Sequence, residues 1–84
     1  MNRDEFVREV DALGVRRESY SLDGGVHNDK YVLSPEPMGR WAVYYSERGL
    51  IFGKEDFDDQ DKAYQYLKEI IISDKTIGLK DIHE

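Results

Sequence analysis

The first part of the chain repeats apolar residues with the period of a helix. Phe6, Val10 and Leu13 recur at spacings of four and three residues, which places their side chains on one stripe of an α-helix. Asn2 precedes this stripe and suits the N-cap position. We therefore predict a helix over residues 3–13.

The middle of the chain alternates apolar and polar residues with a period of two. The clearest case puts Trp41, Val43 and Tyr45 on one face of a strand and Tyr44 on the other. Short turn signals separate the alternating segments, which favours consecutive antiparallel pairing. Strands are predicted at residues 19–22, 30–34, 40–45 and 50–53, the last extending toward Phe57.

Two segments between these strands predict turns or loops. Ser34-Pro35-Glu36-Pro37 cannot form a helix and weakens a strand, so a loop is expected there. Ser46-Glu47-Arg48-Gly49 has the length and the terminal glycine of a tight hairpin turn. The hairpin would join the third and fourth strands.

A helical period returns near the C-terminus. Ala63, Leu67 and Ile71 recur at spacings of four residues, and Asp58 or Asp59 suits the N-cap of a helix ending near Ser73. The remaining residues, 74–84, predict a further helical turn or a frayed tail.

These elements predict an α+β fold. The order is an N-terminal helix, a four-stranded antiparallel meander sheet and a C-terminal helix. Both helices are expected on one face of the sheet, which leaves the other face at least partly in contact with water. The 84 residues form a single domain, because a chain of this length has no room for a second core.

The composition of the chain limits the cellular compartment and the classes of partner that we expect. The chain has 18 acidic and 12 basic residues, a formal net charge of -6, and no cysteine. The absence of cysteine excludes disulfides and thiolate metal sites. No apolar run approaches the length of a membrane span, and the N-terminus lacks the pattern of a signal peptide. We expect a cytoplasmic protein that binds neither membranes nor nucleic acid.

The acidic residues are concentrated where the last strand meets the last helix. A surface of this kind favours a cationic partner. A calcium loop starting at Asp56 is excluded, because its sixth position is Asp61 where glycine is needed and its twelfth is Leu67 where glutamate is needed. Helix capping accounts for part of the cluster, and an interaction surface is the interpretation that we prefer for the rest. The cluster comprises Glu55, Asp56, Asp58, Asp59 and Asp61.

Catalytic chemistry has little support in the sequence. His27 and His83 are the only histidines, and neither has a histidine or carboxylate at ligand spacing. No arrangement of nucleophile and base is recognisable. We expect no enzyme activity, no cofactor and no metal site.

The run from Gly39 to Gly49, Gly-Arg-Trp-Ala-Val-Tyr-Tyr-Ser-Glu-Arg-Gly, is followed by Phe57, acidic residues and Tyr66-Leu67. This pattern resembles small bacterial immunity proteins, which are encoded beside polymorphic or contact-dependent toxins. The resemblance spans about residues 4–72. It implies a protein that binds one cognate toxin tightly and blocks its active site or a substrate-binding surface.

The resemblance and the acidic cluster agree on an acidic binding module. Many toxins of these systems are basic nucleases, so the expected partner is a basic toxin domain and the free protein is expected to be a monomer. The alternative is a non-enzymatic interaction or regulatory module that binds a peptide on its open sheet face. The expected partner-binding residues are Tyr44, Glu47, Glu55, Asp56, Asp58 and Asp61.

Overall fold

The helices and strands follow the predicted order in the computed structural model, which describes residues 1–73. The segment 74–84, for which the sequence predicts a helical turn or a frayed tail, lies outside the described residues. Two short 3-10 helices, η1 (Arg17–Ser19) and η2 (Pro37–Gly39), join longer elements. These longer elements are α1 (Arg3–Ala12), β1 (Tyr20–Ser21), β2 (Lys30–Glu36), β3 (Arg40–Glu47), β4 (Leu50–Phe57) and α2 (Gln60–Ser73).

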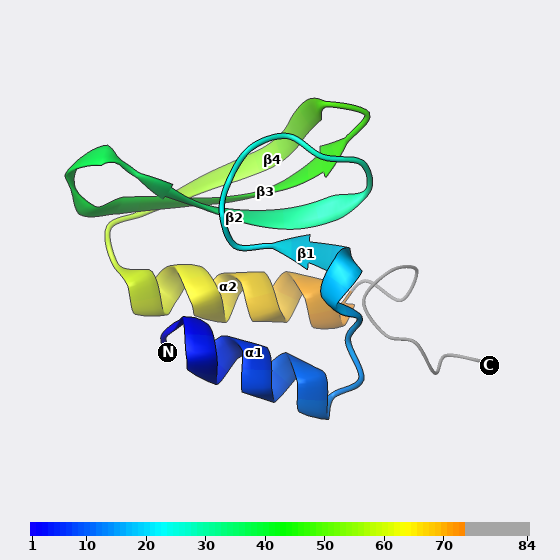
Figure 1. Ribbon diagram of the computed structural model, residues 1–84. Helices are drawn as coiled ribbons and strands as arrows, with labels where there is room; N and C mark the ends of the chain where they lie inside the picture. Colours follow the sequence, from blue (N-terminus) through cyan, green and yellow to red (C-terminus); the bar gives the residue numbers. More distant parts are fainter. Residues whose placement is uncertain (74–84) are drawn as a thin grey trace.

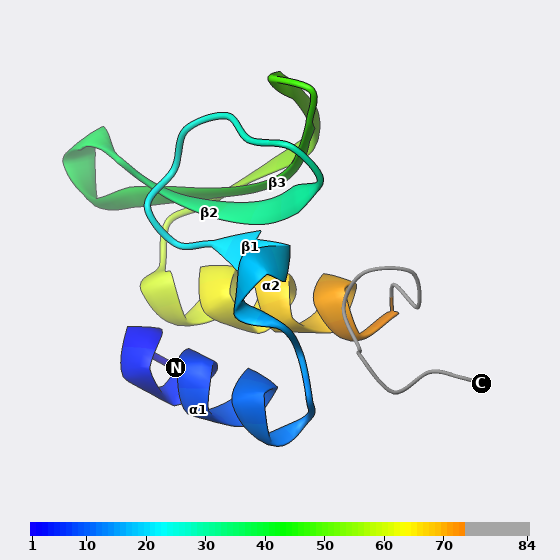
Figure 2. The same cartoon turned by 45° about the vertical axis from the view of Figure 1, so that its right-hand side comes forward.

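Both helices lie on one face of a four-stranded sheet with strand order β1-β2-β3-β4, as predicted. Figures 1 and 2 show α2 directly beneath the sheet and α1 beside α2 on the side away from the strands. This arrangement buries the apolar stripe of α2 between the sheet and α1. Phe6 of α1 contacts both neighbours, with ring centroids 5.3 Å from Tyr20 and 5.5 Å from Tyr64.

The N-terminus of each helix is stabilised by nearby side chains. At α1, the Asn2 side chain accepts a hydrogen bond from the Glu5 amide, and the Glu5 carboxylate accepts one from the Asn2 amide. At α2, the Asp59 carboxylate accepts a hydrogen bond from the Asp61 amide. Such caps satisfy amides that have no partner within the helix, and each contributes about 1 kcal/mol. Both predicted helix starts are therefore confirmed.

The pairing of the first two strands differs from the predicted meander. β1 runs parallel to β2, with Tyr20 opposite Tyr31, whereas the β2–β3 and β3–β4 pairs are antiparallel as predicted. A hairpin would have turned the chain directly back beside β1. Instead the segment 22–29 crosses the sheet before β2 begins, so β2 starts from the same end as β1.

Pro35 lies inside β2 and not in the predicted loop. It pairs with Trp41 of β3. The Leu33 carbonyl accepts a hydrogen bond from the Gly24 amide, so the polar groups of Leu33 point away from β3. Because main-chain direction alternates along a strand, the nitrogen of Pro35 points the same way and the β2–β3 ladder loses no donor.

The sheet face opposite the helices is covered over β2 and β3 but exposed at β4, so it is partly in contact with water, as predicted. Val32, Ala42 and Tyr44 form a small buried cluster on this side, and the segment 22–29 passes over it (Figure 2). Gly24 lies close to β2, because a Cβ built there would lie 2.7 Å from the Ser34 Oγ. A larger residue at position 24 would require the Ser34 side chain or the segment to shift.

The predicted hairpin between β3 and β4 is present, with Arg48 and Gly49 as its two turn residues. Both have positive φ, 55° and 79°, which is the conformation of a type I′ turn. Further along β4, Gly53 also has positive φ, at a register shift that leaves one extra residue on β4. This is a β-bulge, and it bends the strand.

The turn gives a test of the hairpin. Arg48 adopts a left-handed conformation that asparagine tolerates better than arginine does, and Asn-Gly is the preferred type I′ pair. We predict that Arg48→Asn raises the free energy of unfolding by about 0.5–1 kcal/mol, measured by urea denaturation. Arg48→Ala, which also removes the arginine side chain but does not favour the left-handed conformation, is the control. Equal effects of the two substitutions would argue against the I′ turn.

Candidate functional site

The most exposed element of the sheet is its edge strand, β4. It pairs with β3 on one side, and no other strand of residues 1–73 lies against its second side. Every residue from 50 to 56 is exposed, including three consecutive large apolar residues: Leu50 (60%), Ile51 (46%) and Phe52 (49%). Edge strands usually carry charges, prolines or coverings that prevent pairing with other chains. An apolar segment on such an edge is typical of an interaction site.

The predicted acidic residues of β3 and β4 do not form one patch. Glu55 lies opposite Val43 and Asp56 opposite Ala42, so the two carboxylates project from opposite faces of β4. Glu47 lies at the hairpin end, opposite Leu50. Within residues 1–73 none of these three carboxylates has a hydrogen bond or ion pair, so all three are available to a partner.

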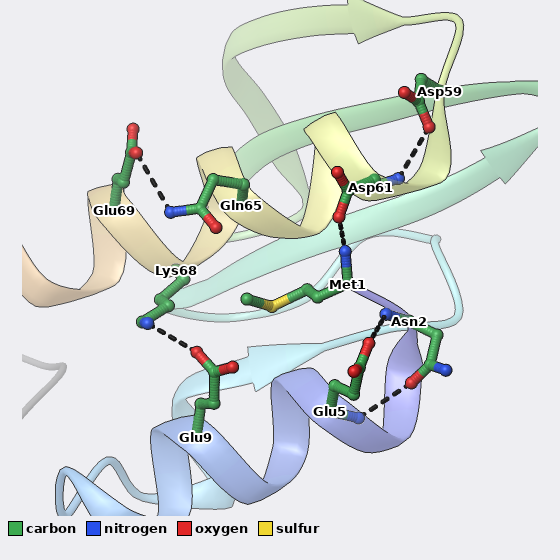
Figure 3. A network of polar contacts seen from close by, with 9 residues as sticks. All are labelled: Met1, Asn2, Glu5, Glu9, Asp59, Asp61, Gln65, Lys68 and Glu69. Carbon is green, nitrogen blue, oxygen red and sulfur yellow. Dashed lines mark hydrogen bonds and ion pairs between the residues drawn. The ribbon is translucent and has the colours of Figure 1, made fainter.

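The acidic residues that follow β4 are partly used within the protein. Asp58 faces Lys62 at 3.9 Å, and both side chains are exposed, so the contact contributes little. Asp59 caps α2. Asp61 binds the ammonium group of Met1, as Figure 3 shows. We therefore define the acidic edge as Glu55, Asp56 and Asp58, and exclude Asp61 because its charge is already compensated.

Tyr44 is buried, contrary to the expectation that it could anchor a partner on an open sheet face. Its side chain is 4% exposed, and its hydroxyl donates a hydrogen bond of 2.6 Å to the Gly25 carbonyl. Burial raises the pKa of the phenol above its ordinary value. Tyr44 therefore holds the segment 22–29 against the sheet and does not present a surface.

A second residue of β3, Ser46, fixes the same segment. It is fully buried. Its hydroxyl accepts a hydrogen bond from the His27 amide at 2.8 Å and donates one to the His27 carbonyl at 3.0 Å. One side chain thus satisfies both main-chain groups of His27. Nothing in the local sequence pattern around Ser46 predicts this contact.

An aromatic groove lies on the helix side of β4. It has a volume of about 340 Å³, and Phe52 is among the residues that line it. The Tyr31 and Tyr45 rings, 4.9 Å apart, contribute the strand side, and Tyr66 and Ile70 contribute the α2 side. The groove therefore extends the exposed apolar surface of β4 toward α2. The sequence does not predict it, because a continuous Leu-Ile-Phe run is more typical of a buried strand.

A larger hollow of about 660 Å³ lies near the opposite edge of the sheet, between α1, η1 and β1. Two of the three arginines that line it are held by carboxylates: Arg3 by Asp23 at 3.0 Å and Arg17 by Asp11 at 2.7 Å. The hydrogen bond from Arg3 holds the pKa of Asp23 below its usual range. Because two of its three arginines are compensated in this way, the hollow is a weaker candidate than β4.

Residues 1–73 hold neither a group of metal ligands nor a membrane-spanning helix. In this part of the chain no three histidine or acidic side chains are grouped so that they could hold a metal ion. No helix described there is long and apolar enough to cross a membrane.

Comparison of the chain with protein-family models, with curated proteins and with solved structures found no match.

The role assigned to Tyr44 can be tested directly. Tyr44→Phe keeps the ring but leaves the Gly25 carbonyl without its donor, so we predict a loss of about 1 kcal/mol in the free energy of unfolding. Tyr66→Phe, whose ring is half-buried, is the matched control and should change stability by less. An unchanged stability of Tyr44→Phe would mean that its hydroxyl does not hold the segment 22–29.

Proposed function

We propose that this protein is a non-enzymatic immunity protein that binds and neutralises a basic bacterial toxin domain in the cytoplasm. The family resemblance suggests the partner. The observation that best supports the binding role is the composition of β4, where an exposed apolar half continues into carboxylates that have no ion-pair partner within residues 1–73.

The charge of the molecule fits a cationic partner. A net charge of -6 on a chain of 84 residues attracts a basic protein over a distance and accelerates its association. The acidic edge lies beside the apolar residues, so the attraction would bring the partner to the place where apolar surface can be buried. Charge would thus mainly determine the association rate, and the apolar contacts would mainly determine the lifetime of the complex.

The way in which such a protein would inhibit follows from the same surface. A nuclease binds a phosphate backbone with basic residues, and carboxylates can occupy those residues in place of the nucleic acid. We therefore propose that the acidic edge covers a substrate-binding surface of the toxin. The proposal requires no catalytic residue, metal or cofactor in this chain, and the free protein is proposed to be a monomer.

The second candidate is an interaction or regulatory module that binds a peptide. The segment 22–29 covers β2 and β3 on the sheet face opposite the helices, so a peptide would have to use the β4 edge. The two candidates therefore share one surface and differ in the identity of the partner.

The test of the proposed function is binding to a basic toxin domain, which the family resemblance implies is encoded beside this gene. We predict that Asp56→Lys slows association roughly tenfold at low ionic strength, with a flatter salt dependence. Stopped-flow fluorescence would measure the rates. Glu18→Lys changes the net charge equally but lies in η1, which precedes β1 at the opposite edge of the sheet, so it should have a much smaller effect.

Growth provides the second measurement. Co-expression of the protein should rescue cells from the neighbouring toxin. Absence of both complex formation and rescue would rule out the proposed function. Equal rates for the two charge variants would leave an inhibitor, but one that uses a surface other than the acidic edge.

A further inference from the structure

We infer that β4 binds its partner by strand addition: an extended segment of the partner pairs with the free edge of β4. This inference deepens the proposed function, on which it rests for the positive charge of the partner. It specifies a main-chain interaction and a composition for the segment, apolar opposite residues 50–52 and rich in lysine or arginine opposite residues 55–56.

The hairpin geometry determines which main-chain groups of β4 are free. In a two-residue type I′ hairpin the flanking residues, Glu47 and Leu50, form a hydrogen-bonded pair. The next pair, Ser46 and Ile51, is therefore a non-hydrogen-bonded one. The amide and carbonyl of Ile51 consequently point away from β3, toward the free edge.

The C-terminal end of β4 also has main-chain groups that point to the free edge. The Leu33 carbonyl points away from β3, so Leu33 and Val43 are a non-hydrogen-bonded pair and Val43 directs its polar groups to Glu55. By alternation, Asp56 directs its amide and carbonyl to the free edge. An added strand would thus find donors and acceptors both before and after the bulge at Gly53.

The side chains of β4 would meet both faces of an added strand. Phe52 projects toward the helices and borders the aromatic groove, whereas Ile51 lies opposite Ser46 and projects to the other face. At the acidic end, Glu55 likewise projects toward the helices and Asp56 to the other face. Each face of an added strand would therefore contact an apolar residue first and a carboxylate later, which matches a segment with one apolar end and one basic end.

A second copy of this chain fits the edge poorly. In an antiparallel pairing centred on β4, Glu55 and Asp56 of one copy would lie opposite Phe52 and Ile51 of the other. Each copy also carries a net charge of -6, so the copies repel each other. A cationic segment of another protein avoids both penalties.

The test uses a synthetic probe in place of the unidentified segment. The probe is an eight-residue peptide with blocked ends, Lys-Thr repeats in one half and Val-Thr repeats in the other, made in both sequence orders. We expect one order to bind, to shift the amide resonances of Ile51 and Asp56, and to slow their hydrogen exchange. The same peptides with glutamate in place of lysine should not bind.

Two substitutions separate the main-chain contact from the side chain. Ile51→Ala removes the apolar side chain but keeps the amide, whereas Ile51→Pro also removes the outward amide without disturbing the bonds to β3. We expect Ile51→Pro to bind the peptide at least about fivefold more weakly than Ile51→Ala. Circular dichroism of both variants would confirm that the sheet is intact.

The outcomes distinguish this inference from the proposed function. Equal peptide affinity of the two variants, no binding by either peptide order, or dimerisation of the protein through β4 would overturn strand addition. If the toxin binds and responds to Asp56→Lys while Ile51→Pro equals Ile51→Ala, the proposed function stands without strand addition. If the peptide results hold but the toxin does not bind, the edge is a strand-binding site for another basic partner.

Discussion

The two hydrogen bonds between Ser46 and His27 determine which parts of the sheet meet water. They hold the segment 22–29 over the face that the helices leave uncovered, and the bond from Tyr44 to Gly25 supports them. With α1 and α2 on one face and this segment on the other, β4 is the strand left exposed, from residue 50 to residue 56. The location of the candidate site therefore follows from a contact that is remote from it.

Local signals in the sequence predict much of this fold. The capping residues Asn2 and Asp59, the apolar stripes of both helices and the turn at Arg48-Gly49 are each defined by neighbours within a few positions, so their structures can be inferred without tertiary contacts. The parallel β1–β2 pair and the covered face could not be inferred in this way. They depend on main-chain groups of the segment 22–29 that bond to β2 and β3, and main-chain groups leave no trace in a hydrophobic pattern.

The candidate site also has features that the sequence predicts and features that it does not. The acidic cluster is visible in the sequence, and Glu55, Asp56 and Asp58 do lie exposed beside one another in the chain. Its internal partners are not visible, because the ammonium of Met1 reaches Asp61 only through the packing of α1 on α2. The exposure of Leu50, Ile51 and Phe52 also escapes prediction, since three consecutive apolar residues normally indicate a buried strand.

The exposed apolar edge of β4 is a risk to the protein, and that risk supports a role in binding. Such an edge favours aggregation, and evolution usually removes it with charge, proline or a covering element. Here Lys54, the bulge at Gly53 and the carboxylates of the acidic edge protect one half of β4, while the apolar half remains exposed. The net charge of -6 keeps copies of the chain apart without hindering a cationic protein. The charges that keep β4 from pairing with other copies of the chain therefore also favour the cationic partner that we propose.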